Sequence, residues 1–173
     1  MYKHLTGQEW EGPFHPVAGQ IEDVLRQNGF WYERFVHGEV RTSEEAARVR
    51  PEYDISQGTK ALIVKAKKSG EEKCFIMVVV PGDRQFDTKK LKTETGYGDI
   101  RFASPEEVAE ITRGVLPGGV PPRGNLFGLA VIADVHIFNN EKIIYNAGDR
   151  RVSIAMYSRD YRKVVVPEVV DIT

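Results

Sequence analysis

The sequence predicts an α/β fold of the α+β type, in which helices surround a mixed and largely antiparallel sheet. The chain has 173 residues, of which 41% are hydrophobic and 28% charged, and this composition suits a single domain with one core. Strand and helix patterns interleave without a regular βαβ rhythm. Two apolar runs, 60–66 and 74–80, flank a short turn that contains glycine, which is typical of an antiparallel hairpin.

Turn residues and a helix breaker organise the N-terminal part. Residues 1–16 are rich in Gly, Pro and aromatic residues, so we expect an irregular lead-in before a domain that spans 17–173. A helix is predicted over 17–27, because Asn28-Gly29 is a common helix end. A strand is expected to follow over 30–36.

Two capping boxes predict helix starts in the middle of the chain. The first, Thr42-Ser43-Glu44-Glu45, predicts a helix over 43–50 that the next proline stops. The second, Ser104-Pro105-Glu106-Glu107, has proline at the favoured first helical position and predicts a helix over 105–112.

The other expected elements are short. A polar helix is predicted over 87–95, and a last helix over 159–163 that Ser158 caps. The remaining strands, each a run of apolar residues between turn signals, are expected at 60–66, 74–80, 126–133, 142–146 and 152–157.

Lys60 stands at the head of a predicted strand, and strand periodicity decides which way it points. Side chains alternate between the two faces of a strand. Lys60 therefore shares a side with Leu62 and Val64, whereas Lys65 and Lys67 lie on the opposite side. Taken alone, a lysine at a strand end is typically one whose stem covers apolar surface.

The turn at 116–122 is a second candidate element. Glycine tolerates close approach and proline locks its own φ, so the amides of Gly118 and Gly119 are expected to be held in a fixed, uncrowded loop. An ammonium group together with exposed amides polarises a carbonyl. A rigid connection between a helix and a strand is the alternative interpretation of this turn.

Net charge and hydropathy limit the possible partners. At a net charge of −1, nucleic-acid binding would require basic clusters that converge on one surface. The longest apolar runs are too short to span a bilayer and the N-terminus has no apolar signal core, so we expect a soluble, cytosolic protein without membrane contact. The basic clusters are Lys65-Lys67-Lys68, Lys89-Lys90-Lys92, and Arg150-Arg151 with Arg159, Arg162 and Lys163.

Several familiar site chemistries are not indicated. Cys74 is the single cysteine and is expected to be a buried, inert thiol. The four histidines lack zinc-site spacing and cysteine partners, so no metal is expected. No nucleophile elbow, P-loop or dinucleotide fingerprint is found. Paired acids such as Glu44-Glu45 are explained by their positions at helix starts.

Five segments in this order and spacing resemble the YbaK/prolyl-tRNA-synthetase-associated domain family. The resemblance runs from about residue 17 to the end, and it implies a single α/β domain that hydrolyses the ester of mischarged aminoacyl-tRNA. The implied partners are the acceptor end of aminoacyl-tRNA and prolyl-tRNA synthetase, and no cofactor is implied. The segments are 58–64, 74–77, 103–108, 116–122 and 148–154.

The resemblance also assigns roles to individual residues. Lys60 matches the family's essential lysine, and Gly118 with Pro122 matches the ends of its G-x-x-x-P motif, which holds the aminoacyl carbonyl and the ribose. Gly118 and Gly119 are therefore expected to act with Lys60 in catalysis. The residues expected to bind substrate are His37, Val120, Pro122, Gly148 and Arg150. The sequence departs from the family pattern at Ala61, Pro121, Ala147, Asp149 and Arg151.

The leading hypothesis is a free-standing deacylase, directed at mischarged tRNA-Pro. Because an aminoacyl ester is already activated, the enzyme mainly has to place water and stabilise the oxyanion, and no strong nucleophile is needed. The alternative hypotheses are a non-catalytic module that binds a tRNA acceptor end or an aminoacyl-like small molecule, and a metabolite hydrolase that uses the same cleft.

Overall fold

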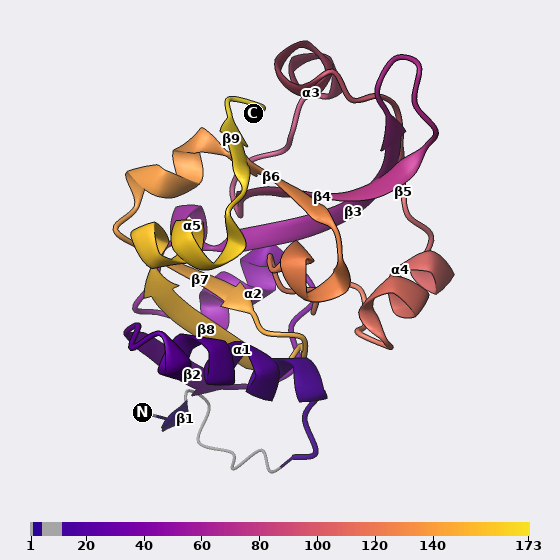
Figure 1. Ribbon diagram of the computed structural model, residues 1–173. Helices are drawn as coiled ribbons and strands as arrows, with labels where there is room; N and C mark the ends of the chain where they lie inside the picture. The colour runs from indigo at the N-terminus through magenta and orange to yellow at the C-terminus, as the bar shows by residue number, and fades with distance from the viewer. Residues whose placement is uncertain (1, 5–11) are drawn as a thin grey trace.

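The computed structural model describes residues 2–4 and 12–173, and this part of the chain forms two β-sheets with helices around them (Figure 1). The strands are β1 (Tyr2–His4), β2 (Tyr32–Val36), β3 (Thr59–Lys67), β4 (Cys74–Pro81), β5 (Gly98–Phe102), β6 (Ala130–Asp134), β7 (Lys142–Asn146), β8 (Val152–Tyr157) and β9 (Glu168–Val170). The α-helices are α1 (Pro16–Gln27), α2 (Ser43–Val49), α3 (Thr88–Thr95), α4 (Pro105–Thr112) and α5 (Ser158–Val165). Short 3₁₀ turns cover Ile55–Gln57, Gly124–Phe127 and Val135–Asn139.

The two sheets are mixed and mostly antiparallel, which confirms the predicted fold class. One sheet has the order β1-β2-β8-β7 and the other β5-β3-β4-β6-β9. The pairs β1–β2, β4–β6 and β6–β9 are parallel, and every other neighbouring pair is antiparallel. A single bridge between Gly58 and Ile144 links the sheets at the point where β3 begins.

The main core lies between the two sheets. Alternate residues of β3 and β4, such as Ile63 and Met77, face Tyr145 and Ile154 of the other sheet, and α1 adds Ile21. The opposite face of the five-stranded sheet is covered by α3, and the opposite face of the four-stranded sheet lies near α2 (Figure 1). Both sheets are therefore covered, which leaves strand ends and sheet edges as places for a site.

The hairpin of β3 and β4 is antiparallel, as predicted, and its register places Lys60 opposite Val80 and Val64 opposite Ile76. On its other side β3 pairs with β5, but only from Val64 to Lys67. Because β5 ends at Phe102, the first half of β3, including Lys60, has no strand on that side among the described residues. Two of the cavities described below lie beside this stretch of β3.

Both predicted helix caps of the central region are present, with one difference in detail. Ser104 accepts from the Glu107 N–H while the Glu107 carboxylate accepts from the Ser104 N–H, so the capping box that starts α4 is complete. Thr42 likewise accepts from the Glu45 N–H at the start of α2. The Glu45 carboxylate accepts from the N–H of Arg41, one residue before the expected one.

Four sequence expectations require correction. The segment 126–133 is a strand only from Ala130, because a 3₁₀ turn occupies its start. Ser158 is the first residue of α5 and not its cap; its hydroxyl donates to the Asn140 carbonyl. Strands β5 and β9 were not expected. Cys74 is exposed at the start of β4, because β4 extends beyond the covered part of the sheet there.

The expected irregular lead-in contains one regular element, since Tyr2–His4 pairs with β2. Residues 1 and 5–11 lie outside the described residues. In the described part of the chain, no helix combines the length and the apolar character needed to cross a bilayer.

Candidate active site

A cavity of about 330 Å³ opens beside the first half of β3. Three segments that are distant in sequence form most of its walls. They are the start of α2, the first residues of β3, and the loop that follows α4 and contains Gly118 and Val120. Lys60 and Gly118, which the sequence analysis paired, both line it, and so does Val120. The fold thus brings the lysine and the glycine loop into one site.

Lys60 is partly buried in this wall. Its Nζ lies 3.4 Å from the carbonyl oxygen of Gly82, the residue that follows β4, and donates to it. Burial lowers the pKa of Lys60, while the carboxylates of Glu44 and Asp83 act in the opposite direction. Desolvation strengthens the field of the ammonium inside the cavity, which is what stabilisation of a developing oxyanion requires.

The glycine loop needs glycine at its tip for two reasons. Gly118 has a φ of +86°, and a Cβ there would lie 2.7 Å from the Arg41 carbonyl oxygen. The Gly119 N–H donates to the Leu116 carbonyl, so it is used to close the turn. No hydrogen bond of the Gly118 or Val120 N–H is found among the described residues. These two amides are the ones available to a ligand.

Arg150, which lies outside the cavity, and Asn146, which lines it, hold this loop in place. Arg150 donates from Nε to the Pro117 carbonyl at 2.6 Å and from Nη1 to Glu39 at 2.9 Å. The Asn146 side-chain amide donates to the Gly118 carbonyl at 2.6 Å. A loop fixed at both of these carbonyls can present its N–H groups without reorganisation.

Arg50 is a second cation in the cavity wall, and its side chain is almost fully buried. Its Nε donates to the Ala46 carbonyl and its Nη1 to Ser153 Oγ. Nη2 has no hydrogen-bond partner within the described part of the chain, and it lies beside Gly58, which also lines the cavity. Burial lowers the pKa of Arg50 to about 10. The cavity wall therefore contains a buried guanidinium that has no carboxylate partner among the described residues.

Ser153 joins Arg50 to the glycine loop. Its Oγ lies 2.7 Å from His37 Nε2 and 3.3 Å from Oδ1 of the Asn146 side chain. His37 Nδ1 lies 2.7 Å from the Gly38 carbonyl, which can only accept, so Nδ1 carries the proton and Nε2 accepts from Ser153. Burial lowers the pKa of His37, which keeps the ring neutral. A buried polar network thus supports the cavity floor.

The cavity wall also contains the exposed carboxylate of Glu44, at the start of α2. Three cationic residues, two residues with unpaired N–H groups and one carboxylate line the same space: Arg41, Arg50 and Lys60, then Gly118 and Val120, then Glu44. Such a set can bind a molecule that carries a carbonyl or ester oxygen together with an ammonium group.

Comparison with known proteins decides the family. Residues 37–164 match the aminoacyl-tRNA editing domain, which is most of the chain. This chain belongs to the aminoacyl-tRNA editing domain family. It is an aminoacyl-tRNA deacylase, a hydrolase of carboxylic esters, as the resemblance implied.

Relatives of this editing domain are found both as separate proteins and within synthetases. It is 30% identical over 149 residues to the multifunctional Ser/Thr-tRNA deacylase ProXp-y of Escherichia coli, covering 86% of this chain and 87% of the relative. It is 29% identical over 107 residues to a proline–tRNA ligase of Trichlorobacter lovleyi, but that alignment covers only 18% of the ligase. A solved structure of a candidate trans-editing enzyme for prolyl-tRNA synthetase has a TM-score of 0.75 and 25% identity, over 93% of this chain and 99% of the other.

Five of the residues expected at the site do not line the active-site cavity: Gly119, Pro122, His37, Gly148 and Arg150. Gly119 and Pro122 support the loop, and the Pro122 carbonyl accepts from Tyr161. His37 lies behind the wall and is fully buried. Gly148 and Arg150 line a separate cavity of about 590 Å³ on the far side of the loop.

Gly148 has a packing role that the sequence did not reveal. Its φ is +90°, and a Cβ there would lie 2.8 Å from the Cβ of Val17 in α1. Its N–H donates to the Gly119 carbonyl, which links the two glycine motifs of the editing domain.

Sequence reasoning missed four residues of the site. Glu44 was explained as a helix-start acid, and Arg50, Asn146 and Ser153 carried no motif. Ser153 lies within 148–154, a segment that the resemblance had already marked, and Asn146 lies two residues before that segment, so these positions were the available signals. Arg50 gave no signal, because an arginine before a proline reads as an exposed helix end.

One group of possible metal ligands lies away from the cavity. Asp134, His136 and Asp171 place ligand atoms within 4.8 Å of one another. Each is already engaged: Asp134 accepts from the N–H groups of His136 and Ile172, and Asp171 pairs with Lys90. The prediction that no metal is bound remains a prediction.

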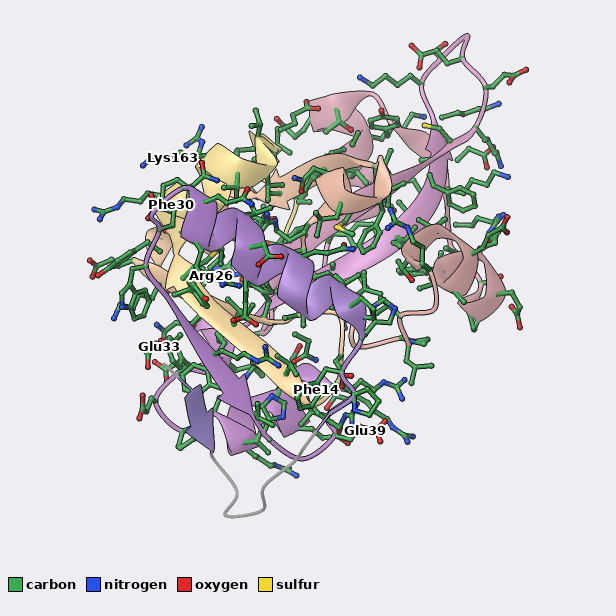
Figure 2. The ribbon with its side chains drawn as sticks, turned by 60° about the horizontal axis from the view of Figure 1, so that its bottom comes forward. Phe14, Arg26, Phe30, Glu33, Glu39 and Lys163 are labelled. Atoms are coloured by element: carbon green, nitrogen blue, oxygen red, sulfur yellow. The ribbon has the colours of Figure 1, made fainter. Side chains whose placement is uncertain are left out.

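The basic clusters do not converge on one surface. Figure 2 shows Phe14 and Glu39 near one end of α1, and Phe30 with Lys163 near the other. Arg150 pairs with Glu39, so it belongs to the first end, whereas Lys163 lies over the Phe30 ring at the second. The turn of the β3–β4 hairpin, which carries Lys68, lies at a distance from α1 (Figure 1). Nucleic-acid contacts must therefore be local.

Proposed function

We propose that this editing domain hydrolyses the ester of mischarged tRNA in trans, with Lys60 and the glycine loop acting on the aminoacyl carbonyl. The observation that supports this proposal is that Lys60, Gly118 and Val120 line one cavity. The Lys60 ammonium stabilises the negative charge that develops on the carbonyl oxygen. The N–H groups of Gly118 and Val120 supply the remaining hydrogen bonds, which are worth about 100-fold or more in rate when they are positioned in advance.

The reaction needs no protein nucleophile. Water adds to the ester carbonyl carbon, the bond between that carbon and the ribose oxygen breaks, and the ribose hydroxyl takes up a proton. The products are the free amino acid and uncharged tRNA. We assign assistance of the attacking water to the neighbouring hydroxyl of the terminal ribose, because the residues lining the cavity include no histidine.

Glu44 and Arg50 are proposed to select the amino acid. The carboxylate of Glu44 suits the α-ammonium of an aminoacyl ester. The free Nη2 of Arg50 suits an oxygen on the amino-acid side chain. A site with an unpaired buried donor rejects analogues that lack the matching oxygen more strongly than an apolar pocket rejects a missing methyl group. Serine and threonine carry such an oxygen, and the Escherichia coli relative is named for Ser/Thr-tRNA.

We propose tRNA-Pro as the nucleic-acid substrate and a cytoplasmic site of action. The support is the similarity to part of a proline–tRNA ligase and to the candidate trans-editing enzyme for prolyl-tRNA synthetase. Prolyl-tRNA synthetase is then the enzyme whose errors this domain corrects.

The test is a deacylation assay over a panel of tRNA-Pro charged with serine, threonine, alanine, cysteine or proline. We expect hydrolysis of the seryl and threonyl esters and a loss of at least about 100-fold in Lys60→Ala. Lys65→Ala is the matched control, since Lys65 lies on the same strand but does not line the cavity. Unchanged turnover in Lys60→Ala rejects the mechanism. Binding of tRNA without hydrolysis of any panel member favours a binding module.

A further inference from the structure

A cavity of about 480 Å³ adjoins the active-site cavity along the open edge of β3. The two share Lys60 and Leu62 as lining residues. Beyond these, the wall comes from β5 and from the segment that precedes α3, with Phe86 and Phe102 as its aromatic members. Nothing in the editing reaction described so far uses this second space.

Phe102 is unusually open for an aromatic residue, with 62% of its surface exposed. It is the one aromatic among the exposed large hydrophobic residues of the described chain. Its ring contacts Phe86 in a T-shaped arrangement with the ring centroids 6.0 Å apart, and most of its surface remains open to a ligand. Exposed aromatic faces of this kind are platforms on which nucleic-acid bases stack.

Substrate geometry points to what lies on this platform. In aminoacyl-tRNA the ester and the terminal adenine are attached to the same ribose. An ester carbonyl held at Lys60 therefore places the adenine about one sugar ring away, in a space that adjoins the active-site cavity. The cavity of Phe102 shares two lining residues with the active site, whereas the cavity behind the glycine loop, which contains Leu116, shares none.

Gln85 adds a polar group suited to adenine. It lines the same cavity, its side chain is exposed, and no hydrogen bond of its amide is found among the described residues. A glutamine amide can donate to N7 of adenine and accept from its N6 amino group at the same time.

We propose that the cavity of Phe86, Phe102 and Gln85 binds the terminal adenine of aminoacyl-tRNA, with the base stacked on Phe102. The inference rests on the proposed editing function, since it places the base relative to an ester at Lys60. Lys60 then lies between the two subsites, where the ribose joins base and ester.

The test measures binding of a tRNA acceptor-stem RNA that ends in adenosine, and of the same RNA with a terminal ribose that carries no base. We expect Phe102→Ala to weaken binding of the first RNA about 5- to 150-fold, the range typical of one stacked base, and to leave binding of the second unchanged. Phe102→Tyr retains the ring and should retain affinity. Because the side chain is exposed, Phe102→Ala should fold, and its thermal unfolding checks this.

Leu116→Ala is the matched control, because Leu116 is also exposed and lines the competing cavity. A second readout uses 2-aminopurine as the terminal base, whose fluorescence should be quenched by the native protein and not by Phe102→Ala. Equal weakening of both RNAs, or weakening by Leu116→Ala alone, overturns the proposal. Base-dependent binding in a protein that hydrolyses no mischarged tRNA would reject the editing function and leave the adenine site standing.

Discussion

Replacement of Gly118 by alanine should lower both stability and activity, and each loss has its own structural cause. With a φ of +86°, an alanine there adopts a left-handed backbone, which costs about 1–2 kcal/mol. Its Cβ would also lie 2.7 Å from the Arg41 carbonyl oxygen. Relief of such overpacking typically costs about 1–3 kcal/mol more. We expect Gly118→Ala to lose about 2–5 kcal/mol of unfolding free energy in total, on these two estimates.

Gly96→Ala is the matched control for the backbone contribution. Gly96 ends α3 with a φ of +79°, and nothing lies within 4 Å of a Cβ built on it. It should lose only about 1–2 kcal/mol and keep full activity. Urea unfolding measures both free energies, and deacylation of mischarged tRNA measures activity.

The loop must move away from Arg41 to accept the alanine, and the amides of Gly118 and Val120 move with it. We therefore expect kcat/KM of Gly118→Ala to fall by about 10- to 1,000-fold, up to the loss of one oxyanion donor. If Gly118→Ala matches Gly96→Ala in both stability and activity, the reasoning about this loop is wrong.

Three further outcomes are expected. Enzymatic kcat/KM, corrected for spontaneous ester hydrolysis, should fall as pH rises through the lowered pKa of Lys60, since the ammonium is the active form; Glu44→Gln should move this fall to lower pH. Ser153→Ala should lose about 1–3 kcal/mol of unfolding free energy and also slow deacylation, because buried Arg50 and its neighbours lose a partner; a fully stable variant would contradict the network. Tyr161→Phe should lose about 1–3 kcal/mol in urea unfolding, because the Pro122 carbonyl loses its buried donor, whereas Tyr157→Phe should not.

The sequence predicted the elements that local chemistry determines. The capping box at Ser104 gave the start of α4, the hairpin signal gave the antiparallel pair of β3 and β4, and alternation gave the face of Lys60. Period-two alternation also distinguished Lys60 from Lys65, and only Lys60 lines the active-site cavity. The resemblance supplied the function, which neither Lys60 nor the glycine loop indicates when taken alone.

Other features depend on tertiary contacts and gave no local signal. Strand β5 contains Gly98 and charged residues, and it is a strand because β3 offers it an edge. The 3₁₀ turn at Gly124–Phe127 packs against β6 so closely that a Cβ on Gly124 would lie 2.6 Å from the Val131 side chain, and this is a tertiary contact. The burial of Arg50 against Ser153 joins residues 103 positions apart, a pairing that no spacing rule predicts.

The most direct test of the central claim is to remove the Lys60 ammonium and then rebuild it chemically. In a Cys74→Ser background, which removes the exposed native thiol, Lys60→Cys is alkylated with 2-bromoethylamine to give an amine of nearly lysine length. We predict that Lys60→Cys loses at least about 100-fold in single-turnover deacylation and that alkylation restores most of it. Full turnover in the unmodified Lys60→Cys protein, or a folded alkylated protein that regains nothing, would contradict the account.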